Sequence, residues 1–287
     1  MSIKLITDSA CDLPENIIKK YNIDVAPLSV HLGEEEFLDG VSIKSKKVLE
    51  DMREGKVYKT SQPTPQAFID ILKKYAEEKE SCLYVGFSSG LSGTFESGML
   101  AKEQILEDYP DFDIDIIDTK CASIGFGIVV LKAAQMIEEG KTKEEIIKAV
   151  KFYSEHMEHI VTVDDLEYLY RGGRVSRTSA FLGGLLNIKP IIEVKEGKLI
   201  PFEKIRGRNK VMKRMVEIMK DRGVDLKNQL IGIAHGDDIE GADKLKDIIK
   251  ETFGCEDFLV SMLGSAIGAH AGPGTIAIFF LNEKSPY

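Results

Sequence analysis

The first 160 residues alternate short apolar runs with amphipathic segments. Four runs rich in aliphatic and β-branched residues predict buried strands at residues 3–7, 23–30, 82–86 and 114–118. Residues 66–78 instead repeat apolar side chains at i, i+3, i+4 and i+7, the spacing of one helix face. This alternation favours a mostly parallel sheet with helices on both faces.

A further helix and strand close this first half of the chain. Thr142 and Glu145 form a capping box, which satisfies N–H groups in the first turn of a helix. The helix is expected to run to about His156, and residues 160–163 predict the next strand.

Beyond residue 160 the pattern is that of a mixed α/β unit. Residues 188–194 and 199–205 flank a Glu-Gly-Lys turn and predict a β-hairpin. We expect two α/β domains, residues 1–160 and 161–287, with a mostly parallel sheet in the first, a mixed sheet in the second and a ligand cleft between them. The remaining elements predicted in the second are a helix at 209–222, a strand at 230–234, a helix at 241–252, and strands at 258–262 and 276–281.

The charge balance argues against a protein whose whole surface attracts nucleic acid. The 287 residues include 47 acidic and 38 basic side chains, for a formal net charge of -9. The N-terminus has no apolar run before a cleavage site, so we expect a cytoplasmic protein. Residues 258–282 are uncharged and long enough to span a bilayer, but a Gly-Pro-Gly break at 272–274 predicts two buried strands and a turn instead. No stable membrane insertion is expected.

Neither cysteines nor histidines predict a metal site. His156 and His159 lie three residues apart, but they lack the glutamate of a His-Glu-x-x-His motif. The cysteines form no Cys-x-x-Cys pair and are expected to be reduced, buried thiols. We therefore expect no metal and no cofactor. The four cysteines are Cys11, Cys82, Cys121 and Cys255.

Polar loops follow the predicted strands, at the sheet edge where helix N-termini gather. Asp8, Ser9 and Asp12 lie in the first loop, and Asp12 is expected to cap the next helix with Pro14 in its first turn. In the second loop Thr64 is expected to cap a helix that begins at Pro65. That capping leaves Thr60 and Ser61 unexplained.

The Gly- and Ser-rich loop at residues 86–94 predicts an anion site. Its small residues let a ligand approach the backbone, and the helix that follows supplies free N–H groups. The loop also contains a Gly-x-Ser-x-Gly match centred on Ser88, with His235 and His270 downstream as candidate bases. A Ser/His lipid or ester hydrolase is therefore an alternative function.

Three basic or glycine-rich segments complete the candidates. Residues 171–174 place two arginines in a tight turn, and His270 lies in an apolar, glycine-rich turn whose glycines suggest a close backbone approach. Residues 204–214 carry six basic side chains, which form either a solvated face or a docking patch. A phosphate- or nucleotide-binding regulator is a third open function.

In this order, the candidate loops resemble the DegV family over nearly the whole chain. The resemblance implies a bacterial protein of two α/β domains with a long-chain fatty acid buried between them. Well-studied members are the acyl-carrier subunit of a fatty acid kinase, so it also implies an ATP-dependent partner kinase that forms an acyl phosphate. The motifs are Thr7-Asp8-Ser9 with Asp12, Thr60-Ser61-Gln62-Pro63, Ser88-Ser89-Gly90-Leu91-Ser92-Gly93-Thr94, Arg171-Gly172-Gly173-Arg174, Lys189-Pro190, and His270 with Gly272-Pro273-Gly274.

The resemblance also implies residue roles. Thr60, Ser92 and His270, with the adjacent Ser61, are implied to bind the carboxylate, and Arg206 with the nearby Arg208 to dock the kinase. No residue is expected to be catalytic, because the chain lacks a Gly-x-x-x-x-Gly-Lys phosphate loop. We expect a carrier rather than an enzyme. The residues implied to support the site are Asp8, Ser9, Gly93, Thr94, Arg171 and Gly272.

Overall fold

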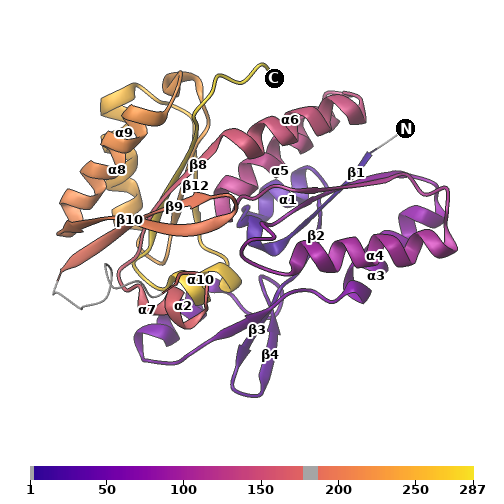
Figure 1. Ribbon diagram of the computed structural model, residues 1–287, viewed down its shortest axis with the longest axis horizontal. Coiled ribbons are helices and arrows are strands. Elements are labelled where there is room, and N and C mark those ends of the chain that lie inside the picture. The colour runs from indigo at the N-terminus through magenta and orange to yellow at the C-terminus, as the bar shows by residue number, and fades with distance from the viewer. Residues whose placement is uncertain (1–2, 177–186) are drawn as a thin grey trace.

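The computed structural model describes residues 3–176 and 187–287, which form two α/β units (Figure 1). In the first unit four parallel strands lie in the order β2-β1-β6-β7. Helices α3 (Pro65–Glu77) and α4 (Thr94–Asp108) pack together and cover one face of this sheet. The expected fold class is confirmed. The strands are β1 (Ile3–Asp8), β2 (Asp24–Ala26), β6 (Ser81–Gly86) and β7 (Ile114–Asp118).

The single strand predicted at residues 23–30 is wrong. β2 ends at Ala26, and the chain then enters β3 (Ser29–Leu32) of a separate antiparallel sheet. Pro27 stands between them, and it breaks a strand because it has no N–H to donate to a neighbour. The separate sheet has the order β4-β3-β5, where β4 is Glu35–Leu38 and β5 is Lys59–Ser61.

The second unit is built on a six-stranded mixed sheet of order β10-β9-β8-β13-β11-β12. The hairpin prediction is confirmed, because β9 and β10 pair in antiparallel register around Glu196 and Gly197, which both have positive φ. The domain boundary near residue 160 stays a prediction. The strands are β8 (Met157–Thr162), β9 (Ile188–Lys195), β10 (Lys198–Arg206), β11 (Ile231–His235), β12 (Phe258–Met262) and β13 (Ile276–Leu281).

Helix α5 (Ser123–Glu138) lies between the two sheets. It packs against β1 on one side and against β8, β11 and β13 on the other, so most of its residues are buried. Because apolar residues lie on most sides of α5, its sequence shows only a weak amphipathic pattern, and the sequence analysis did not predict this helix. The next helix, α6 (Lys143–His156), begins with the predicted capping box of Thr142 and Glu145. Because α5 packs against both sheets, it fixes how the two units meet.

Helices α8 (Arg208–Arg222) and α9 (Ile239–Phe253) cover the other face of the mixed sheet (Figure 1). Both match the predicted positions. Short helical segments link the remaining elements of the chain. They are η1 (Ser9–Cys11), α1 (Glu15–Lys20), α2 (Ser45–Arg53), α7 (Glu167–Arg171) and η3 (Leu226–Asn228).

A helix interrupts the segment predicted as two strands and a turn. The two predicted strands and a turn at 273–274 are confirmed. The sequence analysis missed the helix between them: α10 (Ser265–Ala271) is capped by Gly272, whose φ of 82° favours glycine. α10 is rich in glycine and alanine, which lets it pack closely against α2 and α7. Among the helices described, none is long and apolar enough to cross a membrane.

Candidate ligand-binding site

A cavity lies between the two units, and strands, loops and α10 supply its walls. Its empty space amounts to about 800 Å³, including solvent at the mouth. Almost all of its lining is apolar, so it suits a ligand with a long hydrocarbon part. The apolar lining comprises Leu28, Phe87, Leu91, Ala122, Val161, Val163, Leu169, Val194, Leu199, Leu263, Ala266, Ile267, Ala271, Ala277 and Phe279.

Polar groups in the lining meet where β5 approaches α10. Thr60 Oγ1 and His270 Nε2 are 2.6 Å apart, although 210 positions separate them in the chain. Ser92 and Arg174 also line the cavity. The structure therefore brings together three residues of the implied head-group set, Thr60, Ser92 and His270, and adds a cation.

Ser92 lies in the Gly- and Ser-rich loop just before α4. Its Oγ is 2.8 Å from Thr94 Oγ1 and accepts the N–H of Thr94 at 3.3 Å. Gly93 caps the helix, and a Cβ there would lie 2.7 Å from Nε2 of Gln62. These contacts place the Ser92 hydroxyl beside the cavity and hold the loop against the loop that follows β5.

The sequence analysis named both arginines of the tight turn as candidates but assigned only Arg171 to the site. Arg174 lines the cavity, and its guanidinium donates to the carbonyl oxygens of Leu91 at 3.0 Å and Gly172 at 2.6 Å. Arg171 lies outside the cavity with its guanidinium over the ring of Tyr168, 5.8 Å from the centroid. Only the path of the turn decides which of the two faces inward.

The guanidinium of Arg174 pairs with no carboxylate of the described residues, and burial lowers its pKa. Burial, and secondarily the charge of Arg174, lowers the pKa of His270 to about 4, so the imidazole is neutral at pH 7. Gly172 lets the ring lie against the turn, because a Cβ there would be 2.2 Å from Nδ1 of His270. The polar end thus offers a hydroxyl, an imidazole and a cation whose guanidinium bonds to only two carbonyl oxygens of the described residues.

Ser61 points away from the cavity. Its Oγ lies 2.9 Å from Nε2 of His31 on β3, at an exposed position, and it is absent from the lining. Successive residues of a strand point to opposite faces, so Thr60 facing inward directs Ser61 outward. Gly272 also stands outside the lining, where it packs against Tyr168.

The first polar loop forms a closed cluster instead. Asp8 caps η1, and its carboxylate accepts from Tyr84 Oη and the Phe87 N–H, both at 2.9 Å. Burial raises the pKa of Asp8 to about 7. Ser9 donates to Asp39 Oδ2 at 2.9 Å. Neither Asp8 nor Ser9 reaches the cavity lining.

The predicted cap at Asp12 is wrong. Pro14 occupies the N-cap position of α1, while Asp12 has a left-handed backbone with φ of 53°. Its buried carboxylate accepts from Ser123 Oγ at 2.5 Å and from the Gly264 N–H at 2.8 Å, and burial raises its pKa. Asp12 therefore joins the first unit to α5 and to the start of α10. By contrast, Thr64 caps α3 with Pro65 in its first turn, as predicted.

The hydrolase alternative is unsupported. Ser88 Oγ is fully buried, donates to the Gly197 carbonyl at 2.8 Å and accepts the Gly90 N–H at 3.2 Å. No histidine in the described part of the chain hydrogen-bonds to it: His270 faces Thr60, and Nδ1 of His235 accepts the Asp238 N–H at 3.1 Å. Ser88 instead fastens the β9-β10 turn to the first unit, and it has no base to activate it.

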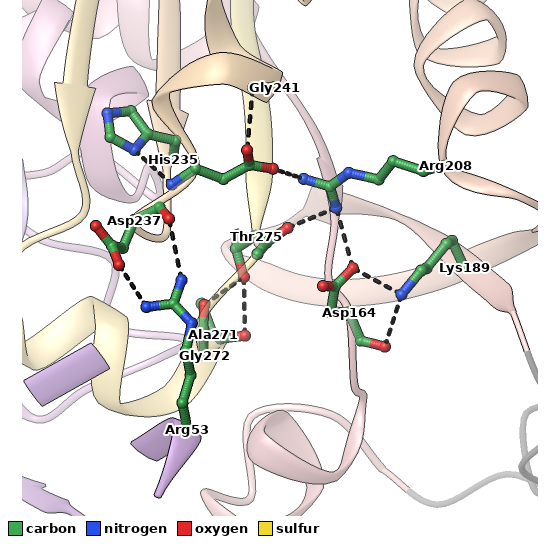
Figure 2. Close-up of polar contacts among 12 residues, drawn as sticks. Arg53, Asp164, Lys189, Arg208, His235, Asp237, Gly241, Ala271, Gly272 and Thr275 are labelled. Atoms are coloured by element: carbon green, nitrogen blue, oxygen red, sulfur yellow. Dashed lines mark hydrogen bonds and ion pairs between the residues drawn. The ribbon is translucent and has the colours of Figure 1, made fainter. Parts of the chain in front are cut away.

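The basic stretch divides into paired and unpaired cations. Figure 2 shows Arg208 between two carboxylates: it pairs with Asp164 at 3.1 Å and with Asp238, and it donates to the Gly274 carbonyl at 2.6 Å. Arg206, at the end of β10, is exposed and pairs with no carboxylate of residues 3–176 and 187–287. Arg208 thus holds the turn that follows α10, whereas Arg206 faces solvent.

The remaining histidine and cysteine candidates have structural partners. His156 bonds to Asn282, and His159, which lines the cavity, bonds to the Met157 carbonyl and the Ala122 N–H. All four cysteines are free and buried, as predicted. In the part of the chain that the structure describes, no group of three His, Cys, Asp or Glu side chains is placed to hold a metal ion.

Comparison with known proteins gives one consistent result. The DegV family model, described as "Uncharacterised protein, DegV family", matches residues 2–283. A DegV domain-containing protein of Clostridium perfringens is 40% identical over 286 residues, covering 98% of each chain. A DegV family protein from Thermus thermophilus, titled for its fatty acid binding, superposes with a TM-score of 0.89 at 31% identity, covering 97% of this chain and 99% of that one. The Streptococcus pneumoniae fatty acid kinase B3 protein, loaded with linoleic acid, gives 0.87 at 25% identity, covering 99% and 100%.

Proposed function

Because the chain belongs to the DegV family, we propose that it binds a long-chain fatty acid in the cavity between its two units. The carboxylate lies at Thr60, Ser92 and His270, and the acyl chain follows the apolar wall. One observation carries this proposal: a mainly apolar cavity whose lining includes Thr60 and His270 in contact with each other, together with Ser92 and Arg174.

The chemistry of the polar end suits a carboxylate. Burying an anion costs several kcal/mol unless donors meet its oxygens. The hydroxyls of Thr60 and Ser92 can donate to the carboxylate, and the neutral imidazole of His270 bonds to Thr60. Arg174 supplies the only cation among the described residues lining this cavity. The acyl chain adds about 0.8 kcal/mol for each buried methylene, so hydrocarbon burial sets affinity and the polar end sets orientation.

The bound carboxylate is presented to an ATP-dependent fatty acid kinase, which forms the acyl phosphate. The sequence has no Gly-x-x-x-x-Gly-Lys loop, so we assign the nucleotide site to the partner. The naming of the pneumococcal relative as a fatty acid kinase protein supports this role. The exposed Arg206 is the docking cation, and an ATP-dependent partner places the carrier in the cytoplasm.

Mass spectrometry of lipid extracted from the denatured protein tests the binding. We expect about one long-chain fatty acid per chain after expression in bacteria. Extraction that finds only trace acid, followed by failure of the delipidated protein to bind added palmitate, overturns the proposal. A thermal unfolding scan of the same preparation verifies that the protein is folded.

A further inference from the structure

Two segments that carry polar groups of the cavity lie against each other, although they are far apart in the sequence. The α10 turn (residues 270–275) begins with His270, and the α7 arm (residues 164–174) ends at Arg174. The segments meet beside the cavity, since a Cβ on Gly172 would lie 2.2 Å from Nδ1 of His270. The spacing between the imidazole and the guanidinium therefore depends on how the arm is set against the turn.

The same two segments also meet at their other ends. A Cβ on Gly274 would lie 2.2 Å from Oδ2 of Asp164, so the carboxylate at the start of the arm lies directly against the backbone of the turn. Between the two ends, the ring of Tyr168 packs on Gly272, where a Cβ would be 2.3 Å from Cδ2. The α7 arm thus contacts the α10 turn along most of its length.

Arg208 joins the arm to the turn with a single nitrogen (Figure 2). Its Nη1 donates to the Gly274 carbonyl at 2.6 Å and to Asp164 Oδ1 at 3.1 Å, while its Nη2 pairs with Asp238 at the start of α9. Lys189 also pairs with Asp164, at 2.6 Å, but its contacts with the described residues do not extend to the α10 turn. Arg208 therefore holds the two segments together and fixes both to the second unit.

The α10 turn can pass a displacement on to His270 because it is closed by internal hydrogen bonds. Thr275 Oγ1 donates to the carbonyl oxygens of Ala271 at 2.8 Å and Gly272 at 2.9 Å (Figure 2). Side chains of a site are held in place by such supporting bonds. The position of Gly274 thus influences where the end of α10, and with it the imidazole, lies.

We propose that Arg208 is a positioning residue for the fatty acid carboxylate. By holding the α7 arm against the α10 turn, it sets the spacing between Arg174 and His270. The inference rests on the proposed fatty acid function. Arg208 is absent from the cavity lining, so it acts through these residues. Its loss should leave the apolar wall in place but misplace the polar groups, whose hydrogen bonds depend steeply on distance and angle.

Two ligands with the same hydrocarbon chain test this role. Palmitate has a charged head group, whereas 1-hexadecanol has a neutral hydroxyl. Calorimetric titration of the delipidated protein, without the kinase, measures the affinity for each. We expect Arg208→Ala to weaken palmitate binding about fivefold or more and 1-hexadecanol binding by less than about twofold. A merely structural role would weaken both ligands equally.

Asp164→Ala separates position from charge. It removes the same contact as Arg208→Ala, but it deletes a negative charge instead of a positive one. A purely electrostatic effect on an anionic ligand would therefore have opposite signs in the two variants. We expect Asp164→Ala also to weaken palmitate, by about threefold or more, and 1-hexadecanol by less than about twofold.

Arg214→Ala is the matched control. Arg214 lies on the same helix as Arg208, pairs with Glu203 at 2.8 Å and Glu217 at 3.1 Å, and stands outside the cavity lining. Its replacement removes a cation and two ion pairs without touching the α7 arm or the α10 turn. Both ligands should bind this variant within about twofold of the unmodified protein.

The outcomes separate this inference from the proposed function. Equal weakening of both ligands by Arg208→Ala, a loss no larger than that of Arg214→Ala, or tighter palmitate binding by Asp164→Ala overturns the positioning role alone. Failure of the unmodified protein to bind palmitate overturns the fatty acid function, and the positioning role with it. Thermal unfolding scans verify that the variants are folded, and Asp164→Ala decides the matter if Arg208→Ala does not fold.

Discussion

Two polar clusters lie where the units of this protein meet, and they differ in the source of their hydrogen-bond partners. In the closed cluster of Asp8, Asp12 and Asp39, every carboxylate oxygen accepts a hydrogen bond from the chain itself. At the polar end of the cavity, Thr60, Ser92, His270 and Arg174 line open space. Similar loop motifs therefore serve the fold in one place and face a ligand space in the other.

A polar cluster with a structural role differs from a binding site in whether its hydrogen-bonding groups are already satisfied. A buried carboxylate with donors on both oxygens, like Asp12, leaves nothing for a ligand to satisfy. Arg174 lines the cavity, and among the described residues its guanidinium bonds to only two carbonyl oxygens. The closed cluster should respond to mutation in stability, and the polar end in ligand affinity.

The largest effect is expected in the closed cluster. Asp12→Ala leaves the Ser123 hydroxyl and the Gly264 N–H buried without an acceptor, which should lower the free energy of unfolding by about 2–5 kcal/mol. Urea denaturation measures the loss. Asp70→Ala, at an exposed position on α3, is the control and should change stability by less than about 0.5 kcal/mol. Equal losses of unfolding free energy in the two variants would contradict a structural role for the cluster.

At the polar end, two adjacent hydroxyls give a matched pair. Thr60→Val keeps the side-chain shape but removes a carboxylate donor, so palmitate should bind roughly fivefold to hundredfold more weakly, which corresponds to ~1–3 kcal/mol. Ser61→Ala removes a hydroxyl that contacts His31 outside the cavity and should leave affinity unchanged. Calorimetric titration of the delipidated variants compares them. Equal weakening by both substitutions would show that the carboxylate lies elsewhere.

The two clusters should also make the free energy of unfolding depend on pH in opposite directions. Burial raises the pKa of Asp8 from 3.8 to about 7, so between these pH values the folded state holds a proton that the unfolded state releases. The contribution of Asp8 to the free energy of unfolding therefore falls as pH rises from about 4 to 7. Burial lowers the pKa of His270 from 6.5 to about 4, so between these pH values the unfolded state binds a proton that the folded state does not. The contribution of His270 to the free energy of unfolding therefore falls as pH drops from about 6.5 to 4.

Substitutions should therefore cost different amounts of stability at the two ends of this range. The cost of Asp8→Asn should be smaller at pH 7 than at pH 4.5, and that of His270→Gln smaller at pH 4.5, each by on the order of 1–3 kcal/mol. Urea unfolding of the delipidated variants at both pH values measures the costs. A cost independent of pH in either variant would contradict the assigned protonation state.

The smallest effect is expected in the basic stretch. Arg208→Ala breaks the contacts with Asp164, Asp238 and the Gly274 carbonyl and should cost about 1–2 kcal/mol. Arg206→Ala should change the free energy of unfolding by less than about 0.5 kcal/mol, yet slow acyl phosphate formation by the partner kinase at low salt, because charge steering is screened at high salt. A kinase rate equal to that of the unmodified protein at low salt would reject docking at Arg206.

Much of the fold could be predicted from local sequence signals. The capping box at Thr142, the cap at Thr64 and the hairpin turn at Gly197 each depend on a few neighbouring residues. Prediction from hydrophobic patterns fails where a helix is buried on most sides, or where one apolar segment contributes strands to two different sheets. Helix α5 is buried on most sides because it packs against both sheets, and Pro27 divides one apolar run between strands of two different sheets.

The candidate site shows the same division. Loop composition and family resemblance singled out Thr60, Ser92 and His270, which the structure places in one cavity lining. The sequence by itself determined which loops are polar, where helices begin and which residue types are available, because these depend on contacts within a few positions.

Only the tertiary structure decided which way each group faces. It turned Arg174 inward and Arg171 outward, and it gave Asp12 and Ser88 partners that lie more than 100 positions away. Thr60 meets His270 across 210 positions, because the packing of α10 beside β5 brings them together. Such contacts arise from the shapes of packed elements, and no local pattern of residues encodes them.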